Sequence, residues 1–75
     1  MDMERSLEDA HLAQANHHIA RAEASFTRQK ILIKQLAADG HDTTVAQRWL
    51  LLIADTLQIM REHRQILLSR LSKNR

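Results

Sequence analysis

The sequence predicts an all-α fold, an antiparallel and coiled-coil-like hairpin of two long helices. Three observations predict it: two apolar seams in which residues recur at steps of three and four, a single glycine between them, and no proline among the 75 residues. Such spacing keeps one stripe of each helix turned toward a partner helix. A single domain over residues 1–75 follows, because a chain of this length supports at most one small core.

The first helix is expected over residues 6–38. The hydroxyl of Ser6 can cap the backbone amide of Asp9, and Glu8 and Asp9 add negative charge to the first helical turn. An alanine-rich run then continues the helix to about Ala38. Its seam comprises Leu12, Ala15, Ile19, Ala22, Phe26, Gln29, Ile33 and Leu36.

A turn is expected over residues 39–43, followed by a second helix over residues 44–72. Gly40 supplies the left-handed conformation that ends a helix without steric cost. The segment Thr44-Val-Ala-Gln47 has the form of a capping box at the start of the second helix. The second seam comprises Ala46, Leu50, Ile53, Leu57, Met60, Arg64, Leu67 and Leu71.

The two seams also predict which residues face each other. If the turn is centred near residues 41–42, small side chains of one seam fall opposite large ones of the other, as a well-filled core requires. The polar residues Gln29 and Arg64 fall opposite Ile53 and Ile19, and we interpret Gln29 as a residue that fixes the register. The remaining predicted pairs are Ile33–Leu50, Phe26–Leu57, Leu12–Leu71, Leu36–Ala46, Ala22–Met60 and Ala15–Leu67.

The second helix carries more apolar surface than the first helix can cover. A second stripe follows the same three-four spacing, and the first helix has no equivalent of comparable size. Because long exposed apolar strips mark contact surfaces, we expect a homodimer in which two hairpins form a four-helix bundle. The sequence leaves open whether the stripe binds a second copy or another protein. The predicted dimer interface comprises Trp49, Leu52, Thr56, Ile59, His63 and Ile66.

The net charge of +2 is too small to indicate a polyanionic partner. Acidic residues gather at the start of the first helix and basic residues at the end of the second, where each suits the helix macrodipole. No apolar run approaches the roughly 20 residues needed to cross a bilayer, and the N-terminus lacks the features of a secretory signal. We therefore expect no nucleic-acid partner, no membrane partner and a cytoplasmic location.

Five histidines among 75 residues raise the alternative of a zinc-type, metal-binding helical bundle. In the predicted register His18 approaches His63 at the open end of the hairpin, and Glu62 could add a carboxylate ligand. The helices carry neither an i, i+4 histidine pair nor paired Glu-x-x-His motifs, however. We therefore expect solvated histidines and no cofactor, with His18 and His63 as the alternative metal ligands.

The sequence offers no catalytic group in a setting that would activate it. It has no cysteine and no tyrosine, it lacks a glycine-rich phosphate loop, and its serines have no neighbouring base with an orienting acid. We therefore expect a non-enzymatic, homodimeric helical module that acts by protein–protein interaction. The metal-binding bundle is the alternative function.

Residues spread over most of the chain carry a resemblance to a known group of sequences. They are His11 to Ala20, Gln29 to Leu36, Gly40 to Thr44, Ala46, Leu50, Leu51, Thr56, Leu57, His63, Arg64, Ile66 and Leu71. In this pattern the chain resembles short helical-hairpin proteins of α-proteobacteria, the rhizobia and their relatives. The Gly40-His-Asp-Thr43 turn between two histidine-bearing helices is the most distinctive part of the likeness. That group has no assigned activity, so the resemblance implies a bacterial source and no mechanism.

Overall fold

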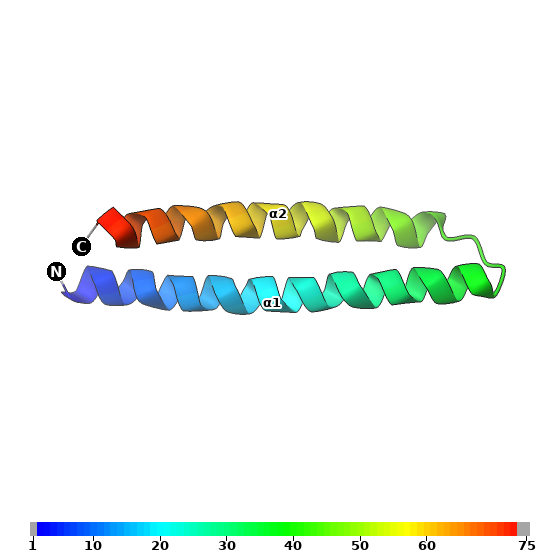
Figure 1. Ribbon diagram of the computed structural model, residues 1–75, viewed down its shortest axis with the longest axis horizontal. Coiled ribbons are helices and arrows are strands. Elements are labelled where there is room, and N and C mark those ends of the chain that lie inside the picture. The colour runs from blue at the N-terminus through cyan, green and yellow to red at the C-terminus, as the bar shows by residue number, and fades with distance from the viewer. Residues whose placement is uncertain (1, 74–75) are drawn as a thin grey trace.

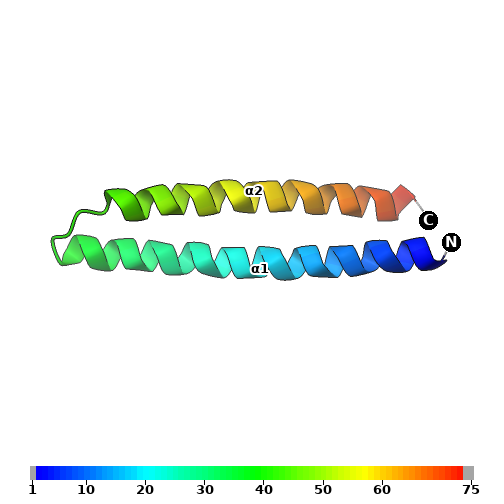
Figure 2. The same cartoon turned by 180° about the vertical axis from the view of Figure 1, so that it is seen from behind.

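The computed structural model describes residues 2–73 and confirms the all-α hairpin. Helix α1 spans Asp2–Ala38 and helix α2 spans Thr44–Lys73. They run antiparallel and side by side, with both chain ends at the same end of the rod (Figures 1 and 2). The rod measures 58 × 14 × 13 Å, so nearly every residue lies close to solvent.

Helix α1 begins at Asp2, whereas the sequence predicts a start at Ser6. Ser6 therefore lies inside the helix, where its hydroxyl cannot act as the predicted N-cap. The preceding residues Met3, Glu4 and Arg5 are good helix formers, and the cost of one interior serine is only a few tenths of a kcal/mol. The helix therefore continues past the candidate cap instead of stopping there.

Gly40 ends α1 as predicted, through a Schellman motif. Its φ of 78° is left-handed, and Gly40 alone among the described residues has a positive φ. The amide of His41 donates to the carbonyl of Leu36 at 2.9 Å, and the amide of Gly40 donates to the carbonyl of Ala37 at 3.1 Å. These two bonds satisfy carbonyls that the end of the helix would otherwise leave unpaired.

The start of α2 is capped by Asp42, and the expected Thr44–Gln47 capping box is not formed. One Asp42 carboxylate oxygen accepts from the amide of Thr44 at 2.9 Å and from its hydroxyl at 2.6 Å. The side chain of Gln47 donates to the Thr43 hydroxyl at 2.9 Å instead of accepting from the backbone. A charged acceptor at a helix N-terminus outcompetes a neutral hydroxyl, which explains the difference. The two bonds from Thr44, the hydroxyl first, lower the pKa of Asp42 below its usual value.

The two predicted seams form the core, since every one of their residues is buried or half-buried. Ile19, Leu57 and Leu67 are the described apolar residues with the least exposure. Four further described residues are half-buried, namely Glu8, Ser25, Thr43 and Ala54. The core is therefore a single line of side chains between two helices.

The register of the seams differs from the predicted one by about one helical turn. The side-chain amide of Gln29 donates to the carbonyl of Ala46 at 2.9 Å. Ile53, the predicted partner of Gln29, lies two turns from Ala46, or about 10 Å along the helix, which a glutamine side chain cannot span. In the same sense, Arg64 donates to Asn16 at 3.3 Å, one turn beyond its predicted partner Ile19.

The path of the turn accounts for this shift. The chain reverses at Gly40, directly after the end of α1, so that residues 41–43 return alongside α1 before α2 begins (Figure 1). Thr43 is half-buried, and Asp42 lines a surface hollow together with Leu36. The chain therefore reverses closer to the end of α1 than residues 41–42, and the predicted pairing of Gln29 with Ile53 is wrong.

Candidate functional site

One side of the hairpin, next to the seam, carries an ion pair that joins the two helices. Arg61 of α2 donates to Glu23 of α1 at 3.0 Å, and these side chains are 45% and 51% exposed. An ion pair with this exposure contributes no more than about 1 kcal/mol. Asn16 and Lys30 lie one heptad before and after Glu23 on the same row of α1, so polar side chains extend along this side.

The other side of the hairpin carries the apolar stripe predicted on α2. Ile59 is two residues from Arg61, which places the two side chains about 200° apart around the helix. All six predicted interface residues are exposed in the hairpin. The apolar members are more than half exposed: Trp49 58%, Leu52 57%, Ile59 66% and Ile66 52%.

Val45 belongs to the same row and was missed in the sequence analysis. It precedes Trp49 by four residues and is 65% exposed. The three-four spacing contains this position, so the sequence pattern alone could have identified it. We call the complete row the α2 stripe, which comprises Val45, Trp49, Leu52, Thr56, Ile59, His63 and Ile66.

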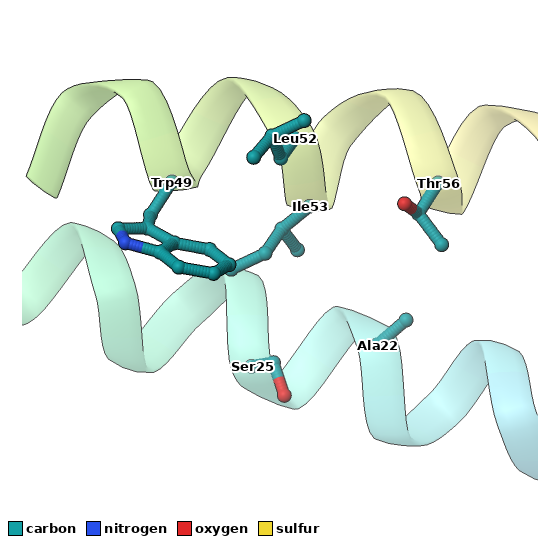
Figure 3. Close-up of a pocket in the computed structure, with 6 residues that line it drawn as sticks. All are labelled: Ala22, Ser25, Trp49, Leu52, Ile53 and Thr56. Atoms are coloured by element: carbon teal, nitrogen blue, oxygen red, sulfur yellow. The ribbon is translucent and has the colours of Figure 1, made fainter. Parts of the chain in front are cut away.

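A shallow hollow lies between the α2 stripe and α1. Figure 3 shows the Trp49 indole extending across toward α1 and the Ala22 methyl pointing toward α2 between Ile53 and Thr56, while the Ser25 hydroxyl points away from α2. Its lining residues are Ala22, Ser25, Trp49, Leu52, Ile53 and Thr56. The hollow exists because small residues of α1 lie beside large residues of α2, and its walls are mostly apolar.

Other large apolar side chains are exposed as well, but they form no comparable row. Leu51 and Leu68 lie on other faces of α2, and Met3, Leu7, Ile31 and Leu32 lie on α1. Scattered exposed apolar residues are normal on a protein surface. The distinguishing property of the α2 stripe is therefore its continuity over six turns of one helix.

The two alternative metal ligands, His18 and His63, are both exposed. His18 lies seven residues before Ser25, and His63 lies seven residues after Thr56, so both lie on the side of the hairpin that has the hollow. Within residues 2–73, the structure brings no three His, Cys, Asp or Glu side chains together in a group that could hold a metal ion. Glu62 accepts a bond from Gln58 at 3.1 Å.

The described part of the chain contains no helix with the length and apolar character needed to cross a bilayer. Comparisons with protein-family models, with curated proteins and with solved structures found no match to this chain. The resemblance to α-proteobacterial hairpin proteins therefore stays a prediction.

Proposed function

We propose that this chain is a non-enzymatic, homodimeric helical interaction module whose α2 stripe binds the α2 stripe of a second copy. The observation that carries the proposal is the α2 stripe, in which five large apolar side chains, each more than half exposed, follow one side of α2 with only Thr56 and His63 among them. Water contact with such a row is unfavourable, and association removes it.

The area of the stripe suits a small dimer. From their exposed fractions, the five large apolar side chains of the α2 stripe present roughly 500 Å² of accessible surface in each copy. Two copies would bury about 1,000 Å² of apolar surface before their polar neighbours are counted, which reaches the lower limit of specific interfaces.

The thin core of the hairpin supports the same proposal. One line of seam residues joins two helices of 37 and 30 residues, and among the described residues only three apolar side chains are buried, none of them completely. Small chains without disulfides or metals commonly gain the missing burial from oligomerisation. Dimerisation through α2 would give that helix apolar neighbours on two faces.

The α2 stripe also favours a second copy over a different protein. From Val45 to Ile66 the stripe contains no acidic residue and no lysine or arginine. Two identical stripes can therefore pack together without burying like charges. A charged surface, in contrast, needs a partner of complementary charge. We infer that protein–protein interaction by this module starts from its self-association.

Sedimentation equilibrium between about 1 and 100 µM tests the proposal. We expect the mass to approach twice 8.7 kDa as the concentration rises. A chain that stays monomeric at 100 µM, with its helical circular dichroism intact, would refute self-association as the function of the stripe.

A further inference from the structure

The residue order of the α2 stripe is similar in both directions along the helix, and this similarity indicates how two copies can pair. We propose that the two α2 helices pair antiparallel about a two-fold axis close to Thr56, with Ile59 of each copy seated in the hollow beside Trp49 of the other. This inference rests on the proposed homodimer and adds its polarity, its axis and the residue that fills the hollow.

The order of residues along the α2 stripe reads similarly in both directions from Thr56. Leu52 and Ile59 lie one turn to either side, and Trp49 and His63 lie two turns away. Val45 and Ile66 lie three turns away, so reversing the helix sets Leu52 opposite Ile59, Val45 opposite Ile66, and Trp49 opposite His63. The small side chain of Thr56 falls at the axis, where the stripe crosses its own copy.

The hollow lies at the level along α2 where Ile59 of the second copy would pack. Its α2 wall extends from Trp49 to Thr56, so its middle lies near Leu52 (Figure 3). Antiparallel pairing about Thr56 brings Ile59 of the second copy level with Leu52. The small side chains of Ala22 and Ser25 leave the room that an isoleucine needs. Ile59 is 66% exposed in the single hairpin and becomes enclosed in this arrangement.

Charges beside the stripe agree with antiparallel pairing. Arg48, Asp55 and Glu62 recur every seven residues and form one row along the edge of the α2 stripe. In the proposed dimer Arg48 faces Glu62 of the second copy at both ends of the interface. Asp55 lies near the axis and faces Asp55 of the second copy. Solvent screens the repulsion between these two carboxylates at this exposed position.

Symmetry then leads to a four-helix bundle. The two-fold axis of an antiparallel pair is perpendicular to the plane that contains both α2 helices. Rotation about this axis therefore leaves a helix packed against α2 on the same side of the plane. The seam and the α2 stripe lie roughly 110° apart around α2. Both α1 helices therefore lie on the same side of the plane, whereas parallel pairing would set them on opposite sides.

Cross-linking of single-cysteine variants tests the polarity, because the chain has no cysteine of its own. The variants are Thr56→Cys, Trp49→Cys and His63→Cys, each treated with a bis-maleimide that spans about 10 Å. We expect Thr56→Cys to cross-link to itself. Trp49→Cys and His63→Cys should not do so alone, because in each dimer the two equivalent positions lie about 20 Å apart along the helices. An equimolar mixture of these two variants should yield the mixed cross-link.

The outcomes separate this inference from the homodimer proposal. The mass of each variant is measured first, at the concentration of the reaction. Monomeric mass of the unaltered chain overturns both proposals. A dimer that self-links at all three positions is parallel, and one that lacks the Thr56 self-link or the mixed product has another axis; either result overturns the inference alone.

Fluorescence of Trp49, the only tryptophan, tests the seat of Ile59. At concentrations where sedimentation shows a dimer, Ile59→Ala should shift the emission of Trp49 to the red, because water enters the hollow. Leu51→Ala is the matched control, since Leu51 is equally exposed but lies off the stripe. Unchanged emission in a dimeric Ile59→Ala variant, or an equal shift in the control, would show that another side chain fills the hollow.

Discussion

Replacing Ile59 with aspartate gives the strongest single perturbation of the proposed interface. Full burial of an isoleucine side chain is worth about 1.5–3 kcal/mol, and two-thirds of Ile59 is still exposed in the hairpin. Dimerisation therefore gains about 1–2 kcal/mol from each copy of Ile59, or about 2–4 kcal/mol in all. The aspartate loses this gain and adds the cost of enclosing a carboxylate in an apolar hollow, which is at least a further 1–3 kcal/mol.

Together these terms amount to at least about 3 kcal/mol, so the dissociation constant should rise about 100-fold or more. Leu51→Asp is the matched control, because Leu51 and Ile59 are both 66% exposed on the same helix. The control changes apolar area, charge and helix propensity to a similar extent, yet its position lies off the α2 stripe. Its dissociation constant should stay within about tenfold of that of the unaltered chain.

Sedimentation equilibrium on the three proteins, with circular dichroism as the check of helix content, measures these constants. Equal weakening by both substitutions would mean that general destabilisation of the hairpin, and not the stripe, controls association. A dimer that survives Ile59→Asp without weakening would place the interface elsewhere.

Three further predictions concern the turn, the cap and the histidines. Gly40→Ala should lower the free energy of unfolding by about 1–2 kcal/mol in thermal or urea denaturation; the added methyl meets nothing within 4 Å, so the cost is that of the left-handed backbone alone. Because the pKa of Asp42 is lower in the folded chain than its ordinary value of 3.8, its stabilising effect is complete above that value and disappears as the pH falls through the folded pKa. Asp42→Asn should remove this part of the acid dependence of the melting temperature, and an unchanged acid profile would refute the capping role. Modest excess zinc should leave the melting temperature unchanged, because only a ligand that binds the folded state raises it; a rise that disappears in the His18→Ala, His63→Ala double variant would establish the metal-binding alternative.

The fold and the seam residues were predictable because they depend on spacing alone. Residues at steps of three and four share one face of any helix, so burial of Ile19, Leu57 and Leu67 followed from the pattern. The role of Gly40 was predictable for a similar reason, because a left-handed residue at a helix end has few alternatives to glycine.

The register and the choice of capping residues depend on competing local interactions, which the spacing of apolar residues does not describe. Where α2 starts relative to α1 depends on the path of residues 41–43 and on the bond from Gln29 to Ala46, neither of which appears in a hydrophobic pattern. Several neighbouring side chains could cap α2, and the choice of Asp42 depends on local geometry. The α2 stripe was predictable as an uncovered surface, but a single chain does not specify what covers it.

The register bears directly on the interface. In the predicted register Ala22 faces Met60, so the small residues of α1 would lie level with Ile59 itself. Antiparallel pairing about Thr56 would then direct Leu52 of the second copy into the gap. The shift of about one turn brings Ala22 and Ser25 level with the segment from Trp49 to Thr56 and moves the hollow toward the turn. In the proposed dimer, the shifted register therefore makes Ile59, and not Leu52, the residue that fills the hollow and whose size and polarity should control association.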